Sequence, residues 1–314
     1  MINVYKTDVE TGKIAVTYAY ENGNWIDLVN PTEDEIKEIC EAVNMNEEFI
    51  KYSLDYEEKA RIDIDEEENS ILYIIDTPIM EVENDSQIYS TIPLGVIFVR
   101  DDYIITVSIK ENKLIDKLKN SKEIYTFKKS RMLLQILYIN SGLFLDSLNK
   151  INKEAEIAEK ELKKSMKNKD VLHMLDLEKS LVYFTTSLKS NEVVMERTMR
   201  GKIIKLYEED EDVLEDAIIE NKQAIEMSQI YDNILNTTME AYASVISNNL
   251  NRVMKILTSI TIIIAIPTLI ASFWGMNVPV PFQNNIHGFA IMIFISLLLG
   301  IIATIWLKKN DMLN

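Results

Sequence analysis

Hydrophobic and polar residues alternate over short runs in the first part of the chain, up to about residue 128. This period of two is typical of β-strands with one buried face. Between two of the runs, Thr32 and Glu35 have the spacing of a helix N-cap and its capping-box partner. Strands mixed with helices that pack on them predict an α+β domain. The expected strands are Ile14–Tyr20, Trp25–Val29, Ala60–Ile64, Ile71–Ile75, Thr91–Val99 and Tyr103–Ile109.

From Ser130 onward the apolar residues recur with a helical period. Two long helices are expected, the first over Ser130–Met166 and the second from Val171, capped by Asp170, to about Arg200. Gly201 and the acidic run that begins at Glu208 mark the next break. A third helix is expected to start near Val213 and to continue through Pro267 to Phe273, because no other Pro or Gly interrupts it.

The last part of the chain contains 52 consecutive residues without Asp, Glu, Lys or Arg, Ile256 to Leu307. Within this block, Leu257–Phe273 and Phe289–Leu307 are nearly pure apolar sequence, and each has about the length needed to cross a bilayer. The alternative is a buried hairpin in a soluble core, but little else in the chain could enclose it. We therefore expect a transmembrane hairpin.

Positive charges flank this hairpin on one side only. Arg252 and Lys255 precede the first span, Lys308 and Lys309 follow the second, and the connecting loop has neither Lys nor Arg. The positive-inside rule then predicts that both ends are cytoplasmic. The amino end is polar and does not resemble a cleavable signal peptide, so a multi-pass protein of the cytoplasmic (inner) membrane with both termini cytoplasmic is expected.

These patterns together predict an α+β cytoplasmic domain, a long-helix stalk and a C-terminal two-helix transmembrane hairpin. The expected divisions are 1–128 for the α+β domain, 129–212 for antiparallel long helices, 213–273 for the stalk helix that continues into the first span, 274–288 for the external loop, 289–307 for the second span and 308–314 for a basic cytoplasmic tail.

Composition excludes several classes of function. With 33 Lys and Arg against 50 Asp and Glu, the chain carries a net charge of −17, which argues against nucleic-acid binding. One cysteine, Cys40, excludes a disulfide scaffold and a cysteine-based zinc site. No glycine-rich phosphate-binding motif is present. The two histidines, His173 and His287, are not part of any recognisable nucleophile–base pair, so an enzyme is not expected.

Small and hydroxylated residues follow one stripe of the first span at alternating spacings of three and four. This stripe consists of Thr258, Thr261, Ala265, Thr268 and Ser272, and it extends backward through Met254 and Asn251. Such a repeat indicates either tight packing between helices or a polar face that lines water. The spacing alone does not distinguish the two. Two spans cannot enclose a pore, so conduction would require a ring of subunits.

The segment Trp274-Gly275-Met276-Asn277, at the outer end of the first span, resembles the Gly-Met-Asn signature of the CorA family of magnesium and cobalt transporters. Tyr more often precedes the Gly in that family. The similarity extends along the chain. Segments that look like family positions are Asn24–Thr32, Asp55–Glu58, Asn221–Gln223, Asn251–Lys255 and Lys308-Lys309.

The resemblance implies a funnel-shaped homopentamer in which the long helix lines the pore. It implies a channel for Mg²⁺, and for Co²⁺ and Ni²⁺ as well. A membrane potential that is negative inside would suffice to drive passive uptake of such ions. Gly275, Met276 and Asn277 would form the selective outer mouth, and Lys308 and Lys309 a cytoplasmic basic collar. The residues carried over to the pore are Asn251, Met254, Leu257, Thr261, Thr268 and Asn277, most of which fall on the stripe.

The family also suggests that cytoplasmic Mg²⁺, bound by carboxylates between subunits, closes the pore, so that Mg²⁺ is both cargo and regulator. Asp216 matches the stalk acid by its distance from the signature, and Glu83 and Asp85 are candidate partners. In one respect the chain departs from the family. Its external loop lacks the acidic residue that often follows the signature, so cations would be concentrated less strongly at the mouth.

The sequence leaves two alternatives to magnesium uptake. The first is a zinc-transporting relative of the same fold, against which Met276 argues, because zinc relatives usually change the middle residue of the signature. The second is a non-conducting, membrane-anchored helical scaffold or receptor. That alternative predicts that Asn277 and Thr268 tolerate large apolar residues without loss of function.

Overall fold

The computed structural model describes residues 1–8, 12–83, 86–100, 102–121, 124–165, 168–201 and 203–313. The chain forms two compact units, residues 1–236 and 237–314. One helix, α6 (Glu208–Trp274), belongs to both of them. The first unit carries the mixed sequence of the amino-terminal part, and the second carries the uncharged block.

The centre of the first unit is one seven-stranded sheet in the order β2-β1-β3-β7-β6-β5-β4. All neighbours are antiparallel except β3 and β7, which run parallel because the chain crosses to the other half of the sheet after β3. The strands are β1 (Ile2–Thr7), β2 (Ile14–Thr17), β3 (Trp25–Val29), β4 (Arg61–Asp65), β5 (Ser70–Glu83), β6 (Ser86–Val99) and β7 (Tyr103–Ser108).

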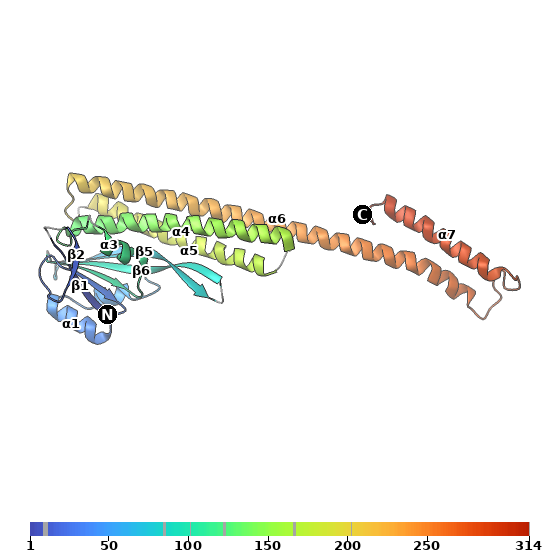
Figure 1. Ribbon diagram of the computed structural model, residues 1–314, viewed down its shortest axis with the longest axis horizontal. Coiled ribbons are helices and arrows are strands. Elements are labelled where there is room, and N and C mark those ends of the chain that lie inside the picture. The colour runs from blue at the N-terminus through green and yellow to red at the C-terminus, as the bar shows by residue number, and fades with distance from the viewer. Residues whose placement is uncertain are drawn as a thin grey trace. The chain divides into compact units, whose positions relative to one another are not determined.

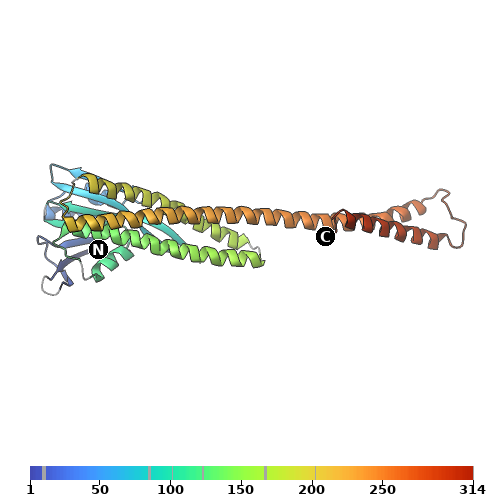
Figure 2. The ribbon, with the colours of Figure 1, turned by 90° about the horizontal axis from the view of Figure 1, so that it is seen from above.

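Helices cover both faces of this sheet, so the unit has three layers (Figure 1). In a second view, α4, α5 and the first part of α6 again run beside one another (Figure 2). The helices are α1 (Glu33–Val43), α2 (Glu48–Ser53), α3 (Lys113–Asn120), α4 (Lys129–Ser165) and α5 (Asn168–Gly201). The predicted α+β architecture, with strands followed by long helices, is confirmed.

The alternation along the strands separates the core into two layers. In β6, Val96 and Phe98 face the cluster built on α3, α4, α5 and α6, whereas Ile97 and Val99 face the cluster built on α1 and α2. Successive strand residues point to opposite faces, so both faces of the sheet must be apolar when helices cover both. This explains why the central strands read as nearly continuous hydrophobic runs.

A polar network is buried on the helix-rich face. Asp27 in β3 is fully buried and accepts a hydrogen bond from the Thr106 hydroxyl at 2.9 Å, and Thr106 accepts one from Trp25 Nε1 at 2.8 Å. The Lys119 ammonium lies 3.3 Å from the other Asp27 oxygen. Burial raises the pKa of the Asp27 carboxyl, and Lys119 and Thr106 oppose that shift.

The ends of several elements test the sequence predictions. The capping box of Thr32 and Glu35 is confirmed at the start of α1. Asp170 as the cap of α5 is wrong, because α5 begins at Asn168 and Asp170 lies in its first turn. The acidic run is not a break either, since α6 begins at Glu208. Carboxylates in a first turn are stabilised by the positive end of the helix dipole.

The second unit contains the last part of α6, a loop and α7 (Gly288–Lys309). α6 continues without a break through Pro267. α7 ends at Lys309, and Lys308 and Lys309 are the basic residues of its last turn. The predicted pair of C-terminal apolar helices is confirmed.

Candidate functional site

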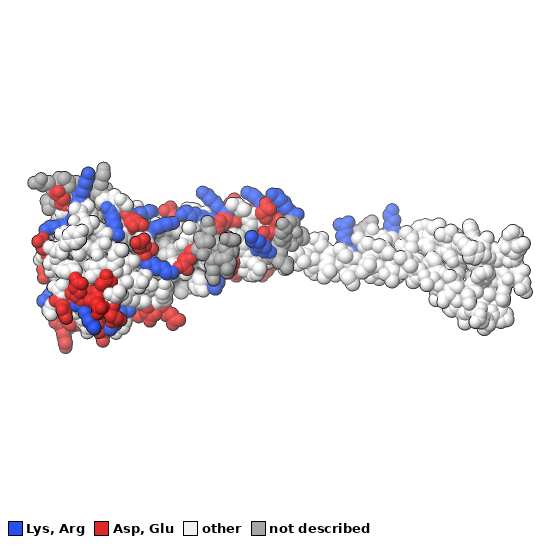
Figure 3. All heavy atoms as spheres, turned by 60° about the horizontal axis from the view of Figure 1, so that its bottom comes forward, with Lys and Arg blue, Asp and Glu red and all other residues white. Residues whose placement is uncertain are grey.

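Two helices are long and apolar enough to cross a membrane, α6 and α7. Only 6% of the residues in the apolar window of each helix are buried within the chain. A core helix of a soluble protein would be mostly buried, so these apolar surfaces require lipid or other subunits as their surroundings. Figure 3 shows the matching charge distribution, with acidic and basic side chains gathered over the first unit and almost none over the apolar helices.

The two faces of α6 within the second unit differ in their contacts: one packs against α7 and the other does not. From Asn251 to Trp274, the wholly or partly shielded residues of α6 are Ile256, Ser259, Ile263, Ile266, Pro267, Ile270 and Trp274, and apart from Pro267 they recur every three or four positions. Of these, Ile266 and Ile270 line an apolar cavity together with residues of α7. Each stripe residue from Thr261 to Ser272 lies two positions from a member of this set. A step of two residues is a rotation of about 200°, so the polar stripe faces away from α7.

The stripe lines an open groove of about 490 Å³ on α6. Thr261, Ala265, Thr268 and Ser272 contribute to this groove, with Ile264 and Leu269 at its sides. The Thr261 hydroxyl donates to the Leu257 carbonyl at 2.9 Å, and the Thr268 hydroxyl donates to the Ile264 carbonyl at 2.9 Å. These bonds use the hydroxyl hydrogens within the helix, so the oxygen lone pairs remain available to a hydrated cation.

The other predicted pore residues also lie on exposed positions. Met254 is 52% exposed and Leu257 is 57% exposed, and Asn251 and Thr258 are exposed too. Leu257 directly precedes the stripe residue Thr258, so it lies beside the stripe and not on it. The second unit therefore leaves all of the predicted pore positions open, and a lumen would need neighbouring copies of the same helix.

The signature lies in a loop that the chain holds in place. Trp274 ends α6, and its Nε1 donates to the Pro281 carbonyl at 3.2 Å. Phe282 has a positive φ of 62°, which turns the chain back toward α7. At Gly288, a Cβ would lie only 2.4 Å from the Phe282 carbonyl oxygen, so this close approach requires glycine. The loop thus has a defined course between the spans.

Asn277 lies three residues beyond the end of α6. Gly275 N–H donates to the Ala271 carbonyl at 2.9 Å, which closes the last turn, and Asn277 itself is exposed. Within the described part of the chain, its amide side chain makes no hydrogen bond. Asn277 therefore does not tie down the loop, and its carbonyl oxygen is free to contact a ligand. The negative end of the α6 dipole lies beside it and favours cations.

The basic residues gather at the opposite end of the hairpin. The Ser259 hydroxyl donates to the Met312 carbonyl at 2.9 Å, which joins the C-terminal tail to the start of the first span. Lys255, Lys308 and Lys309 consequently lie at the same end. Since no Lys or Arg occurs in the loop at the other end, the charge asymmetry predicted from sequence is present in the folded hairpin.

The predicted regulatory residues are only partly covered by the structure. Asp216 is an exposed residue of α6. Asp85 lies outside the described residues, as does the side chain of Glu83, the last residue of β5. In the described ranges, no three Asp, Glu, His or Cys side chains come together as a metal site.

Near Asp216 the structure reveals one acid that the sequence reasoning missed. The charge of Glu220 raises the pKa of Tyr138 in α4, and Asp216 contributes to the same shift. Glu220 is four residues after Asp216, so both carboxylates lie on one face of α6. This helical spacing is a signal that the sequence alone could have supplied.

These features define the class of protein: a membrane protein in which an α+β domain precedes a long helix and two apolar spans. The family is defined by comparison. The model of the family described as "CorA-like Mg2+ transporter protein" matches residues 20–309, and the chain belongs to this family. Members of the family are transporters or channels and not enzymes.

Two curated relatives carry the name "Cobalt/magnesium transport protein CorA". The chain is 29% identical over 275 residues to the protein of Methanocaldococcus jannaschii, and this alignment covers 84% of the chain and 83% of the relative. It is 24% identical over 167 residues to the protein of Thermotoga maritima, and this alignment covers 53% of the chain and 48% of the relative.

Solved structures show the same fold. The complete CorA magnesium transporter from M. jannaschii matches with a TM-score of 0.81 at 24% identity, over 97% of this chain and 96% of the other. The full-length CmaX protein matches with a TM-score of 0.70 at 13% identity, over 98% and 97%. The ZntB cytoplasmic domain from Vibrio parahaemolyticus matches with 0.60 at 10% identity, over 78% and 98%.

Proposed function

We propose that this chain is one subunit of a homopentameric channel that conducts Mg²⁺, and also Co²⁺ and Ni²⁺, into the cytoplasm. The observation that carries the proposal is the open polar groove of Thr261, Ala265, Thr268 and Ser272, which faces away from α7. A face that α7 does not cover needs another partner. Copies of α6 around an axis would provide one, with α7 outside them.

The chemistry of the groove suits a hydrated divalent cation. Mg²⁺ loses its water shell reluctantly, so a pathway lined by neutral oxygens can bind the hydrated ion without stripping it. Asn277 would offer amide oxygens at the mouth, and Thr268 and Thr261 would offer hydroxyls further along. Met254 and Leu257 would form apolar rings that close by dewetting. Lys308 and Lys309 would form the cytoplasmic collar.

Membrane potential can drive this transport without another energy source. At about 100 mV, inside negative, a divalent ion gains roughly 4.6 kcal/mol on reaching the cytoplasm. The charge asymmetry of the hairpin supports a protein of the inner membrane that has both termini in the cytoplasm. Passive uptake would then be sufficient.

Closure by cytoplasmic Mg²⁺ is part of the proposal. Asp216 and Glu220 share one face of α6, and a cation between subunits would relieve their mutual repulsion. An ion that prefers the closed ring shifts the population toward it. Asp216→Ala should therefore raise the Mg²⁺ concentration that closes the channel. Glu226→Ala, an exposed acid on the same helix, is the matched control, and an equal response of both variants would exclude Asp216 as a ligand.

Magnesium uptake into proteoliposomes tests the main proposal. Asn277→Ala should strongly reduce uptake, whereas Asn284→Ala, which removes the same amide from the same loop, should not. Equal uptake by wild type and Asn277→Ala would remove the proposed selectivity role. Competition by Zn²⁺ in the same vesicles separates the zinc alternative, since a zinc transporter would show Zn²⁺ uptake that excess Mg²⁺ does not inhibit.

A further inference from the structure

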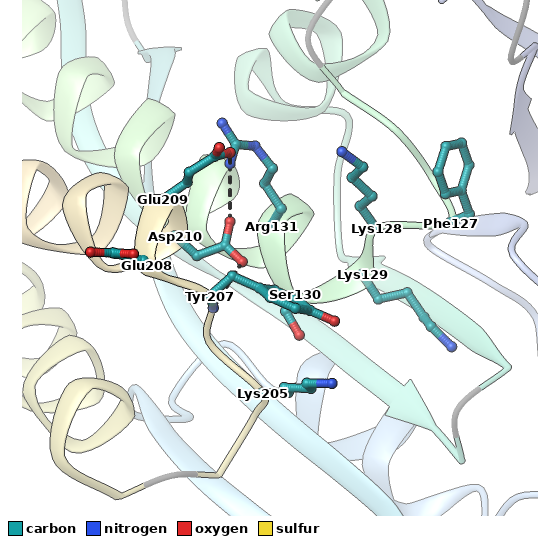
Figure 4. A pocket seen from close by; sticks show the side chains of 10 residues that line it. All are labelled: Phe127, Lys128, Lys129, Ser130, Arg131, Lys205, Tyr207, Glu208, Glu209 and Asp210. Atoms are coloured by element: carbon teal, nitrogen blue, oxygen red, sulfur yellow. Dashed lines mark hydrogen bonds and ion pairs between the residues drawn. The ribbon is translucent and has the colours of Figure 1, made fainter.

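A cavity of about 680 Å³ in the first unit lies where α4 and α6 begin. Its lining comes from two segments that are far apart in the sequence, and Figure 4 shows the side chains of both. The lining residues are Phe127, Lys128, Lys129, Ser130, Arg131, Lys205, Tyr207, Glu208, Glu209 and Asp210. Cavities of this size are typical of small-molecule sites. Neither the transport pathway nor the proposed closure uses any of these residues.

The charge of this cavity is opposite to that of the chain. The chain carries −17, yet four of the lining residues are Lys or Arg and three are Asp or Glu. Arg131 pairs with Asp210 at 3.1 Å and with Glu209 at 3.6 Å. Arg131 offsets one of these two negative charges, the Glu209 side chain is 89% exposed to solvent, and Figure 4 shows Glu208 directed away from the lysines. The three lysines line the cavity on the side away from this ion pair.

Two of the lysines are held close to aromatic rings. The Lys128 ammonium lies 5.2 Å from the centre of the Tyr125 ring, and the Lys205 ammonium lies 5.1 Å from that of Tyr207. Such contacts leave ammonium hydrogens available to an anion. α4 also begins at Lys129, and the first N–H groups of a helix have no partner within it. The positive end of the α4 dipole thus lies at the cavity, beside these lysines.

Two aromatic side chains remain exposed at the cavity. Phe127 is 43% exposed and Tyr207 is 59% exposed. Their rings offer flat faces on which a planar ring system can stack, a contact that depends little on which base is present. The cavity therefore combines a cationic side for phosphates with aromatic surface for a base.

We propose that this cavity binds a nucleoside polyphosphate. The phosphates contact Lys128, Lys129 and Lys205, and the base stacks on Tyr207 or Phe127. Charge-assisted hydrogen bonds between ammonium and phosphate supply most of the affinity. The site needs no glycine-rich loop, because side chains and the start of α4 provide the donors. Since α6 begins at this cavity, its first turn would sense the ligand.

Isothermal titration calorimetry on the full chain in detergent tests the cationic side. ATP is titrated in magnesium-free buffer, so that its phosphates do not remove Mg²⁺ from other sites. The double variant Lys128→Gln/Lys205→Gln should bind at least about tenfold more weakly, because two charged contacts of this kind are lost. Lys163→Gln/Lys164→Gln, an equal loss of charge at the far end of α4, should bind like wild type.

Lys128 and Lys205 are both exposed, so their replacement should not impair folding. Absence of ATP binding by the wild-type chain would overturn the proposal, and so would equal affinities for wild type and the Lys128/Lys205 variant. The aromatic side has its own test. Tyr207→Ala/Phe127→Ala should weaken ATP but not inorganic triphosphate. If triphosphate binds wild type as tightly as ATP does, the base has no role and the nucleotide assignment fails.

Discussion

Thr106→Val tests how the buried polar network stabilises the sheet on which the first unit is built. Valine keeps the shape of threonine but removes the hydroxyl, so the variant creates no cavity. Asp27 loses a donor at 2.9 Å, which costs about 1.5–3 kcal/mol for a bond to a charged group. Trp25 Nε1 loses its acceptor at 2.8 Å, and a buried unsatisfied N–H costs about 1–3 kcal/mol. Together we expect a loss of roughly 3–5 kcal/mol.

Thermal unfolding in detergent, followed by tryptophan fluorescence at one scan rate, measures this loss. For a unit of this size, the expected change lowers Tm by roughly 6–20 °C, at about 2–4 °C per kcal/mol. Thr106→Ser is the matched control, because it keeps the hydroxyl and removes only a methyl group. If both variants unfold within about 2 °C of each other, the hydroxyl contributes nothing, and the description of the network is wrong.

Three further predictions concern other parts of the chain. Burial raises the pKa of Asp76 to about 6, so the free energy of unfolding should fall by about 3 kcal/mol as pH rises from about 4 through 6 and this carboxyl becomes charged. Tm should fall over the same pH range, and Asp76→Asn should remove that part of the fall. A pH profile of Tm that is the same in wild type and Asp76→Asn would contradict this prediction. Gly288→Ala should displace the loop between α6 and α7 from Phe282 and reduce Mg²⁺ uptake, whereas Gly300→Ala, with no neighbour within 4 Å, should not; equal uptake would show that the loop course is unimportant. Ala265→Leu should block uptake by filling the groove, and normal flux in vesicles would place that face outside the pathway.

Local patterns predicted the features that depend on neighbouring residues. The capping box at Thr32, the two apolar helices and the stripe from Thr258 to Ser272 all follow from short spacings that the fold does not change. Strand lengths were harder to predict. β5 was expected to end at Ile75, before Asp76 and Pro78, but it continues to Glu83.

The reason for this continuation is tertiary. Asp76 N–H donates to Asn191 Oδ1 at 2.9 Å, and the Asp76 carbonyl accepts hydrogen bonds from the side-chain amides of Asn140 at 2.7 Å and Asn191 at 2.9 Å. Helices α4 and α5 thus satisfy the backbone of β5 where its own sequence favours a break. Neither asparagine lies near Asp76 in the sequence, so no local pattern could indicate these contacts.

The same limit applies to sites built from distant segments. The cavity at the start of α4 joins residues 127–131 with 205–210, and only the packing of α4 against α6 brings these segments together. By contrast, the proposed pathway lies on α6 and the loop that follows it. The stripe from Thr258 to Ser272 could be predicted from spacing, whereas Leu257 and Asn277 depended on the resemblance to the family. Strand β1 and the short helices α2 and α3 were not predicted, because each is too short to show a clear period.

The central claim is that the polar face of α6 lines a water-filled path for cations. Cd²⁺ block of Mg²⁺ uptake tests it most directly, in a Cys40→Ser background with a single new thiol. The account predicts that micromolar Cd²⁺ blocks uptake by Thr268→Cys but leaves Ile266→Cys, on the face toward α7, unaffected. Equal sensitivity of the two variants, or block only at position 266, would contradict it.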